Sequence, residues 1–200
     1  VSTHSCADVV QTARDYYNSA DADNFYSTIW GGEDIHVGLY RAATDTIAEA
    51  SRRTVERLAK RMQPLYNAMH VLDMGSGYGG TARYLAQTFG CKITGLNLSE
   101  VENRRARQLN EDMGLEGAID IVEGNFEAVD APDASYHAVC SQDAFLHSGH
   151  RASVVSEAAR VLKTGGLFVF TDIMQADDCP QWVLQPILDR IHLSSLGCPS

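Results

Sequence analysis

Residues 71–80 read VLDMGSGYGG, and this stretch decides the fold. A short apolar run that carries one acid, Asp73, leads directly into four glycines within six positions, from Gly75 to Gly80. The apolar run is typical of a strand that is buried on both faces. Glycine lets the backbone adopt positive φ and approach a ligand closely. The stretch therefore predicts a central strand, a ligand-binding turn and the start of a helix.

Strands and helices alternate along the sequence around this turn. Apolar residues at i, i+3 and i+4 predict helices, and unbroken apolar runs predict buried strands. Two pairs, Thr46 with Glu49 and Ser99 with Glu102, have the spacing of helix capping boxes. The predicted order is helix 46–62, strand 70–74, helix 81–89, strand 91–98, helix 99–113, strand 118–124, strand 136–142, helix 154–162 and strand 167–172.

This alternation predicts an α/β fold with an open, doubly wound and mostly parallel sheet, because parallel strands need helical crossovers. Ligands bind such sheets at the carboxyl ends of the strands, where the strand order reverses. Gly75, Asn97, Asn125 and Gln142 all fall at that edge. We expect residues 1–66 to form N-terminal helices and an aromatic lid, and residues 67–200 to form the ligand-binding core.

Composition excludes several classes of partner. A net charge of −10 argues against nucleic acid, because phosphate binding needs clustered Lys and Arg. Apolar runs fall short of the roughly 18 residues of a membrane span. The five cysteines are odd in number, widely spread and without metal-ligand spacing, which favours reduced thiols in a cytoplasm and predicts no metal site.

The glycines formally satisfy G-x-G-x-x-G, so a dinucleotide site is one interpretation. Two residues argue against it. Asp73 would place a negative charge beside a pyrophosphate at the helix start. Asn97, at the end of the second strand, replaces the acid expected on an NAD ribose. A nucleoside that carries an amino group and no phosphate suits Asp73 better, and S-adenosylmethionine is such a ligand.

VLDMGSGYGG resembles the first motif of the Rossmann-like S-adenosylmethionine-dependent methyltransferases. EGNF, residues 123–126, resembles their adenine-contacting turn, and SQDAFLH, residues 141–147, resembles the segment after their fourth strand. Asn97 stands where that family usually has an acid for the ribose hydroxyls, with which an amide also pairs. The resemblance implies a cofactor site made by Asp73, Gly75, Ser76, Gly77, Asn97, Leu98, Asn125, Phe126 and Gln142. His36 either touches the cofactor carboxylate or fixes its own loop.

An aromatic-rich segment precedes the predicted core. DNFYSTIWGGEDIHVGLY, residues 23–40, is too irregular for a core helix and predicts an N-terminal lid. Together with SQDAFLHS (141–148) and QPILDRI (185–191), it resembles the sarcosine and dimethylglycine N-methyltransferases that make glycine betaine. The lid is also similar to that of tocopherol and sterol methyltransferases. A tocopherol- or sterol-like acceptor, or phosphoethanolamine, therefore stays an alternative.

The phosphoethanolamine N-methyltransferases use a Tyr–His pair that closes over the amine. Counted back from the lid glycine Gly31, their tyrosine falls on Tyr26, and their histidine falls on His147. The resemblance implies that these two residues are catalytic. His147 has the side chain whose pKa best suits a proton relay. Packing of Tyr26 in the lid and capping by His147 are the structural alternatives.

Two further residues are implied for the acceptor. An arginine that grips the substrate phosphate in those relatives falls on Arg190, which in this chain suits a carboxylate through two parallel hydrogen bonds. Trp30, with Tyr16 or Tyr17, offers aromatic faces to a sulfonium and to a quaternary product. Trp30 as a core residue and Arg190 as a solvated helix residue are the alternatives.

The family fold usually adds a β-hairpin after the fifth strand. The sequence ends at Ser200, soon after QPILDRIHLSSLG, so we expect this hairpin to be missing and one edge of the sheet to be open. The expected partner is a small-molecule amine, with no nucleic acid and no membrane. The expected state is a monomer or a weak homo-oligomer.

Overall fold

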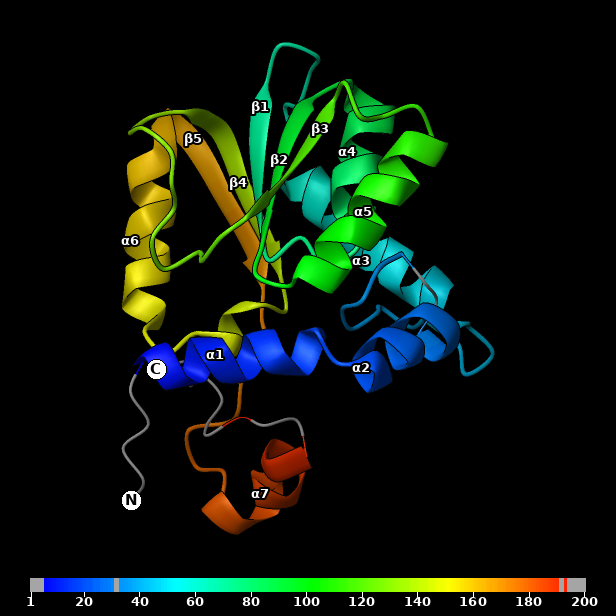
Figure 1. Cartoon of the computed structure of the whole chain (residues 1–200), viewed down its shortest axis with the longest axis vertical. Coiled ribbons are helices and arrows are strands. Elements are labelled where there is room, and N and C mark those ends of the chain that lie inside the picture. Colours follow the sequence, from blue (N-terminus) through cyan, green and yellow to red (C-terminus); the bar gives the residue numbers. More distant parts are fainter. Residues whose placement is uncertain (1–5, 31–32, 191–192, 194–200) are drawn as a thin grey trace.

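The computed structural model describes residues 6–30, 33–190 and 193 (Figure 1). Its elements follow the alternation that the sequence predicts from residue 70 to residue 172. In chain order they are α1 (Cys6–Tyr17), α2 (Ala20–Asn24), the π-helix η1 (Phe25–Trp30), α3 (Ile47–Arg61), β1 (His70–Met74), α4 (Gly80–Phe89), β2 (Lys92–Asn97), α5 (Glu100–Asp112), β3 (Ile119–Glu123), β4 (Tyr136–Gln142), the 3₁₀ helix η2 (Phe145–His147), α6 (Arg151–Val161), β5 (Leu162–Thr171) and α7 (Gln181–Arg190).

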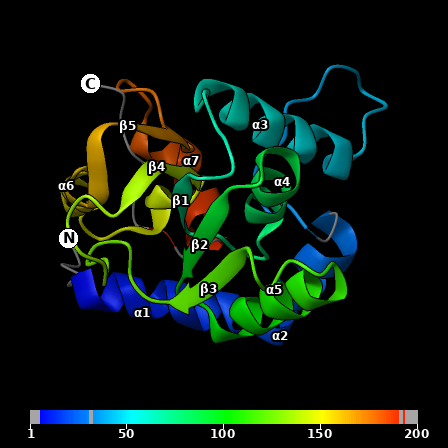
Figure 2. The ribbon, with the colours of Figure 1, turned by 90° about the horizontal axis from the view of Figure 1, so that it is seen from above.

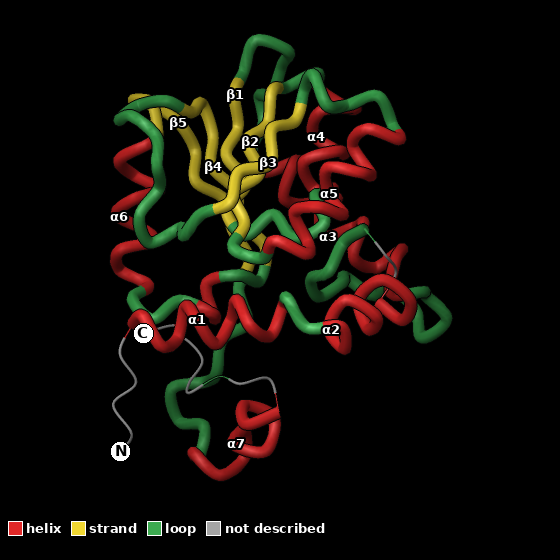
Figure 3. The backbone as a smooth tube through the Cα atoms, in the orientation of Figure 1, coloured by secondary structure: helices red, strands yellow, loops and turns green. Residues whose placement is uncertain are grey.

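The five strands form one parallel sheet in the order β3-β2-β1-β4-β5 (Figure 3). From the central β1 the chain continues through β2 to the edge strand β3, and β4 then pairs with the other side of β1. This confirms the predicted open, doubly wound fold. The reversal lies between β1 and β4, which is the position where such sheets bind ligands.

Two apolar cores cover the two faces of the sheet. Seen from above, α3, α4 and α5 lie on one side of the strands and α6 on the other (Figure 2). Adjacent residues of one strand divide between the cores, because side chains of a strand alternate between faces. Val71 packs with the helices of the first side, and Leu72 packs with α6. The central strand β1 is therefore buried on both faces, as its sequence predicts.

Helix capping follows the sequence at one site and departs from it at another. Thr46 and Glu49 form the complete capping box of α3. Ser99 accepts a hydrogen bond from the backbone N–H of Glu102 at the start of α5, but the Glu102 carboxylate does not return to the cap. It accepts instead from the Asn97 side chain, at 2.9 Å. The second predicted box is therefore half correct, and the displaced carboxylate becomes part of the site described below.

Strand β5 begins earlier than the sequence predicts. The segment KTGG, residues 163–166, belongs to the strand rather than to a turn before it. Tyr136 pairs with Leu162, whereas Ala138 pairs with Leu167, so β5 bulges between these two contacts. Gly165 takes a φ of +80° within the bulge, a conformation that glycine accommodates without strain.

Helix α1 lies across the carboxyl ends of the strands (Figure 1). Polar contacts near its C-terminal end fasten it to the core. The Ser99 hydroxyl contacts the Tyr17 carbonyl at 3.2 Å and the Asn18 side-chain oxygen at 2.8 Å. Arg14 pairs with Glu123 at 3.5 Å near the surface, where an ion pair contributes little. This helix forms one wall of the cavity at that edge of the sheet.

Among the glycines of the decisive stretch that take a positive φ, Gly75 has the tightest surroundings. Its φ is +79°, and an added Cβ would lie 2.5 Å from the Cβ of Ala144. We expect Gly75→Ala to destabilise the fold by about 1–3 kcal/mol, because strain and a steric clash combine. Urea unfolding checks this. Gly117→Ala is the matched control, since a Cβ there meets nothing within 4 Å. Equal unfolding midpoints for the two variants would contradict the steric argument.

Candidate active site

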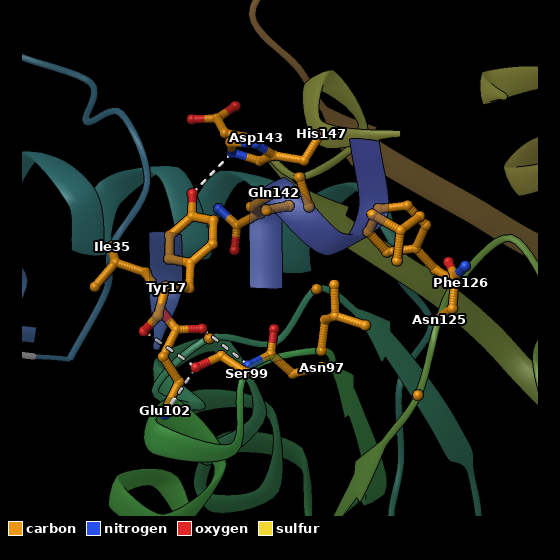
Figure 4. A pocket seen from close by; sticks show the side chains of 17 residues that line it. Tyr17, Ile35, Asn97, Ser99, Glu102, Asn125, Phe126, Gln142, Asp143 and His147 are labelled. Atoms are coloured by element: carbon orange, nitrogen blue, oxygen red, sulfur yellow. Dashed lines mark hydrogen bonds between the residues drawn. The ribbon is translucent and has the colours of Figure 1, made fainter. Parts of the chain in front are cut away.

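A cavity with about 700 Å³ of empty space opens at the carboxyl ends of β1, β2 and β4 (Figure 4). We call it the nucleoside cavity. Helix α1 lines it through Val10, Ala13 and Tyr17. Seven of the predicted cofactor residues lie on its wall: Gly75, Gly77, Asn97, Leu98, Asn125, Phe126 and Gln142.

A smaller cavity adjoins it and shares Ile35, Gly75 and Gln142 with it. It has about 300 Å³ of empty space between the loop 33–36 and the start of α4, and we call it the polar annex. The other three predicted cofactor residues, His36, Asp73 and Ser76, line this annex. The structure therefore brings the whole predicted cofactor set to two adjoining cavities, and their role in binding stays a prediction.

Buried polar atoms without a partner concentrate in the polar annex. Within the described part of the chain, five of its lining residues each have such an atom: Asp34 Oδ1, His36 Nε2, Asp73 Oδ2, Ser76 Oγ and Gln142 Nε2. Each unsatisfied buried group costs the fold about 1–3 kcal/mol. The set offers carboxylate oxygens to an ammonium and nitrogen or hydroxyl groups to a carboxylate. An amino-acid group fits this donor and acceptor set.

Asp73 stands at the floor of the annex and is 3% exposed. Its pKa is raised to about 7, mainly by burial, while a hydrogen bond from Cys140 lowers it and the nearby Asp34 carboxylate adds to the rise. Gln142 is held beside it, because the Thr81 hydroxyl donates to the Gln142 side-chain oxygen. A carboxylate this poorly solvated gains strongly from a cation placed against its free oxygen.

Glu102 is a site residue that the sequence reading missed. It is 3% exposed and lines the nucleoside cavity. Its Oε2 accepts from the Asn97 amide, and its Oε1 has no partner among the described residues. Burial raises its pKa to about 7. An acid therefore does lie beside Asn97 at the cavity wall, five residues later in the chain, in the first turn of α5.

The far end of the nucleoside cavity is apolar. Phe126 and Phe145 meet edge to face with ring centroids 5.8 Å apart. Asn125 accepts a hydrogen bond from the backbone N–H of Glu127 at 2.8 Å, which fixes its amide at the cavity wall. A flat aromatic base suits such a slot, since it is apolar on its faces and polar at its edge.

Tyr17 and His147 form a hydrogen-bonded pair on the opposite wall (Figure 4). The Tyr17 hydroxyl lies 2.8 Å from His147 Nε2. Burial, with a smaller contribution from the Arg151 charge, lowers the pKa of His147 to about 4. Burial raises the pKa of Tyr17 well above its usual value. Near neutral pH the hydrogen bond therefore joins a neutral imidazole to a protonated phenol.

Tyr17, and not Tyr26, is the tyrosine that is hydrogen-bonded to His147 in this structure, and the catalytic role of Tyr26 stays a prediction. The Tyr26 ring stacks on Tyr17 with centroids 6.0 Å apart. The Tyr26 hydroxyl contacts that of Tyr16 at 3.5 Å and interacts with that of Tyr17. Tyr26 therefore adjoins the Tyr17–His147 pair from the side of the lid.

An aromatic cavity adjoins the pair on its outer side. It has about 1100 Å³ of empty space, part of it open to solvent, and Tyr16, Tyr17, Phe25, Tyr26, Trp30 and His147 supply its aromatic lining. The Trp30 ring nitrogen donates to the His36 carbonyl at 3.1 Å, so Trp30 also holds the loop of the annex. Arg190 ends α7, and its side chain lies outside the described part of the structure.

The loop that roofs the annex is tied down along its length. Ser51 and Thr54 of α3 donate through their hydroxyls to the carbonyls of His36 and Val37, both at 3.0 Å. From the other side, Asp143 accepts from the Val37 backbone N–H and from the Thr171 hydroxyl, both at 2.8 Å. Asp143 reaches both partners from a left-handed backbone conformation, with φ +48°.

Metal ligands do not gather in this site. Among the residues that the structure describes, no three His, Cys, Asp or Glu side chains form a group that could hold a metal ion. The cysteines in the same part of the chain, Cys91, Cys140 and Cys179, are free thiols.

The comparisons with known proteins identify the class of this fold and site. Residues 72–170 match a family model described as a methyltransferase domain. The sarcosine/dimethylglycine N-methyltransferase of Halorhodospira halochloris is 58% identical over 191 residues, which cover 96% of this chain and 68% of the relative. The enzyme of the same description from Aphanothece halophytica is 50% identical over 189 residues, which cover 94% of this chain and 68% of the relative.

A crystal structure assigned to a sarcosine dimethylglycine methyltransferase from Galdieria sulphuraria superposes with a TM-score of 0.83 at 44% identity, and the match covers 90% of this chain and 69% of that one. Matching sterol 24-C-methyltransferases are more distant, at 32–35% identity over 42–44% of their length. The chain therefore belongs to the sarcosine/dimethylglycine N-methyltransferase family and is an enzyme. None of the described helices is both long and apolar enough to cross a membrane.

Proposed function

We propose that this chain transfers a methyl group from S-adenosylmethionine to the amine nitrogen of sarcosine and of dimethylglycine, and so forms glycine betaine. One observation carries the proposal. Tyr17, Asp143 and His147 line both the nucleoside cavity and the aromatic cavity. A donor in the first cavity and an acceptor in the second would therefore meet at a residue pair that is able to move a proton.

The residues present fit the proposed cofactor. Leu98, Asn125 and Phe126 would hold the adenine, and the free oxygen of Glu102 would accept from a ribose hydroxyl. Asp73 would face the amino group, with the other unsatisfied atoms of the polar annex around the carboxylate. When bound, the cofactor supplies a methyl group on a sulfonium, which a neutral amine attacks directly.

Proton removal is the chemical task that falls to the protein, because an amine that carries a proton has no lone pair for attack. His147 is neutral before the reaction owing to its lowered pKa, and in the tautomer with a free Nε2 lone pair it accepts a hydrogen bond from the Tyr17 hydroxyl. The Tyr17 oxygen is then free to accept a hydrogen bond from an N–H group of the acceptor amine. A proton leaving the amine passes to Tyr17 while the phenolic proton passes to His147 Nε2.

The aromatic cavity supports a cationic acceptor over a lipid-like one. Trp30 packs against Phe25 and Tyr26 with ring centroids 5.7 and 5.9 Å apart. Ring faces attract methylated ammonium groups by cation–π interaction, which is worth about 0.5–2 kcal/mol for each contact. The same cluster favours an acceptor whose nitrogen ends as a quaternary ammonium, which keeps its positive charge at every pH.

The direct test supplies the chain with S-adenosylmethionine and one acceptor at a time, and measures S-adenosylhomocysteine together with the methylated product by mass spectrometry. Sarcosine and dimethylglycine are expected to turn over. Phosphoethanolamine and a sterol serve as competing acceptors. Turnover of the sterol without turnover of either amino acid would replace this proposal by the lipid-acceptor alternative.

Glu102→Gln tests the missed acid independently of the acceptor. The glutamine keeps the shape of the side chain but loses the charge that strengthens a hydrogen bond to a ribose hydroxyl. We expect affinity for S-adenosylhomocysteine to fall by about tenfold, which is about 1.4 kcal/mol. Titration calorimetry measures it, with the exposed Glu100→Gln on the same helix as control. Unchanged affinity would remove Glu102 from the site.

A further inference from the structure

Asp73 and Cys140 are direct neighbours on the central strands. The register of β1 and β4 pairs these two residues, so their side chains leave the sheet on the same face. Asp73 is 3% exposed and Cys140 is 0% exposed. Water therefore has little access to either group, so contacts with the protein determine their protonation and orientation.

The thiol contacts one oxygen of the carboxyl group and leaves the other free. Cys140 Sγ donates to Asp73 Oδ1 at 3.6 Å. Asp73 Oδ2 has no partner among the described residues and lines the polar annex. Burial and the neighbouring carboxylate raise the pKa of the Cys140 thiol well above its usual value, so the sulfur keeps the proton that it donates.

We propose that Cys140 is a positioning residue for cofactor binding. Its thiol holds Oδ1 and thereby turns the free Oδ2 of Asp73 toward the cofactor amino group. This inference rests on the proposed use of S-adenosylmethionine. It assigns a task to a cysteine that lies beneath the site and touches no bound molecule.

The other groups around Asp73 do not perform this task. Asp34 also lines the annex, and its carboxylate forms an ion pair with Arg52 at 3.1 Å. His36 lies across the annex on the loop 33–36, with its Nε2 unsatisfied. The Gln142 amide nitrogen is likewise unsatisfied. Within the described chain, the Cys140 thiol is the hydrogen-bond donor to the Asp73 carboxyl group.

A thiol suits this position because it is a weak donor. Its hydrogen bond orients the carboxylate but compensates little of the negative charge, so the carboxylate still attracts the ammonium strongly. Serine is a stronger donor of similar shape and would keep the orientation. Alanine would leave both oxygens of a buried carboxylate without a donor, which raises the cost of its ionised form.

The test measures binding of two probes by titration calorimetry between pH 5.5 and 9. S-Adenosylhomocysteine carries the amino-acid group, whereas 5′-methylthioadenosine lacks it. We expect Cys140→Ala to weaken S-adenosylhomocysteine binding by about tenfold at pH 7 and to move the pH midpoint of binding upward. Binding of 5′-methylthioadenosine is expected to stay unchanged. Cys140→Ser is expected to stay within about threefold of the wild type.

Cys91→Ala is the matched control, because Cys91 is equally buried in the same apolar core and its thiol donates to the Tyr66 carbonyl, away from both cavities. Cys140→Ala that binds S-adenosylhomocysteine with the wild-type affinity and midpoint would overturn the inference. Equal weakening of both probes would overturn it too, since general loosening of the core acts on both. Failure of the wild type to bind S-adenosylhomocysteine would instead overturn the proposed function.

Discussion

Replacing His147 by alanine is expected to lower kcat by about a hundredfold or more, because the acceptor proton then lacks its final site. Tyr17→Phe is expected to produce a loss of the same order, since it removes the hydroxyl that lies 2.8 Å from His147 Nε2. Affinity for S-adenosylhomocysteine is expected to change little in either variant. Initial rates with saturating cofactor and dimethylglycine measure the first effect, and calorimetry measures the second.

Tyr26→Phe distinguishes the observed pair from the one that the sequence suggests. It removes a hydroxyl that contacts the Tyr16 hydroxyl at 3.5 Å and interacts with the Tyr17 hydroxyl, but is not the one paired with His147, so we expect a smaller loss of kcat, of less than about tenfold. The ring that stacks on Tyr17 remains. A large loss for Tyr26→Phe together with a small loss for Tyr17→Phe would show that the pair rearranges when the acceptor binds.

The pH profile adds an independent check on the relay. The pKa of His147 is lowered to about 4, so the imidazole is neutral across the range from pH 6 to pH 9. A rise of kcat in that range is therefore expected to follow deprotonation of the bound amine and not of His147. The rise should persist in His147→Ala at a lower level. A titration near 6.5 that disappears in this variant would contradict the buried, neutral state of the histidine.

Asp73→Asn is expected to weaken binding of S-adenosylhomocysteine by about a hundredfold, because it removes a charge-assisted hydrogen bond to an ammonium in a poorly solvated cavity. For the wild type, affinity is expected to fall as pH drops below about 7, where the Asp73 carboxyl becomes protonated and neutral. The variant is expected to lose this dependence. Calorimetry at pH 6 and pH 8 measures both.

The same substitution is expected to stabilise the protein without cofactor. The pKa of Asp73 is raised from 3.8 to about 7, so between these values the folded state holds a proton that the unfolded chain has released. The free energy of unfolding therefore falls as pH rises from 4 to 7, by about 1.4 kcal/mol for each pKa unit of difference. The asparagine does not ionise and escapes this loss.

We expect Asp73→Asn to be about 1–3 kcal/mol more stable than the wild type at pH 8, after allowance for the amide that it buries, and about equal to it below pH 4. Urea unfolding without ligand measures the difference, and the exposed Asp120→Asn on β3 is the control. A variant that binds weakly and is also less stable at pH 8 would mean that Asp73 serves the fold rather than the cofactor.

The arrangement of the sheet was predictable because the residue at which each strand ends is visible in the local sequence pattern. Each apolar run ends in a residue that must lie at the same edge once the strands are parallel, and Gly75, Asn97 and Gln142 do lie there. The start of β5 was not predictable from KTGG. Two glycines after a helix are typical of a turn, and only pairing with β4 draws them into a bulged strand.

The residues that sequence reasoning missed depend on contacts between distant segments. Tyr17 meets His147 across 130 positions, and no local spacing marks it apart from Tyr16 or Tyr26. Glu102 carries a local signal, but that signal is the capping pattern with Ser99, which assigns its carboxylate to the wrong partner. A buried amide at Asn97 without a nearby acid was the available indication that another acid had to be close.

The contact from Tyr17 to His147 joins two segments that enclose the site, because Tyr17 ends α1 and His147 follows β4. The loop 33–36 is fixed separately, by hydroxyls of α3 and by Asp143. Any displacement of α1 from the nucleoside cavity would therefore break the proposed proton relay and leave this loop in place. We expect the relay to be assembled only while α1 lies over the cavity.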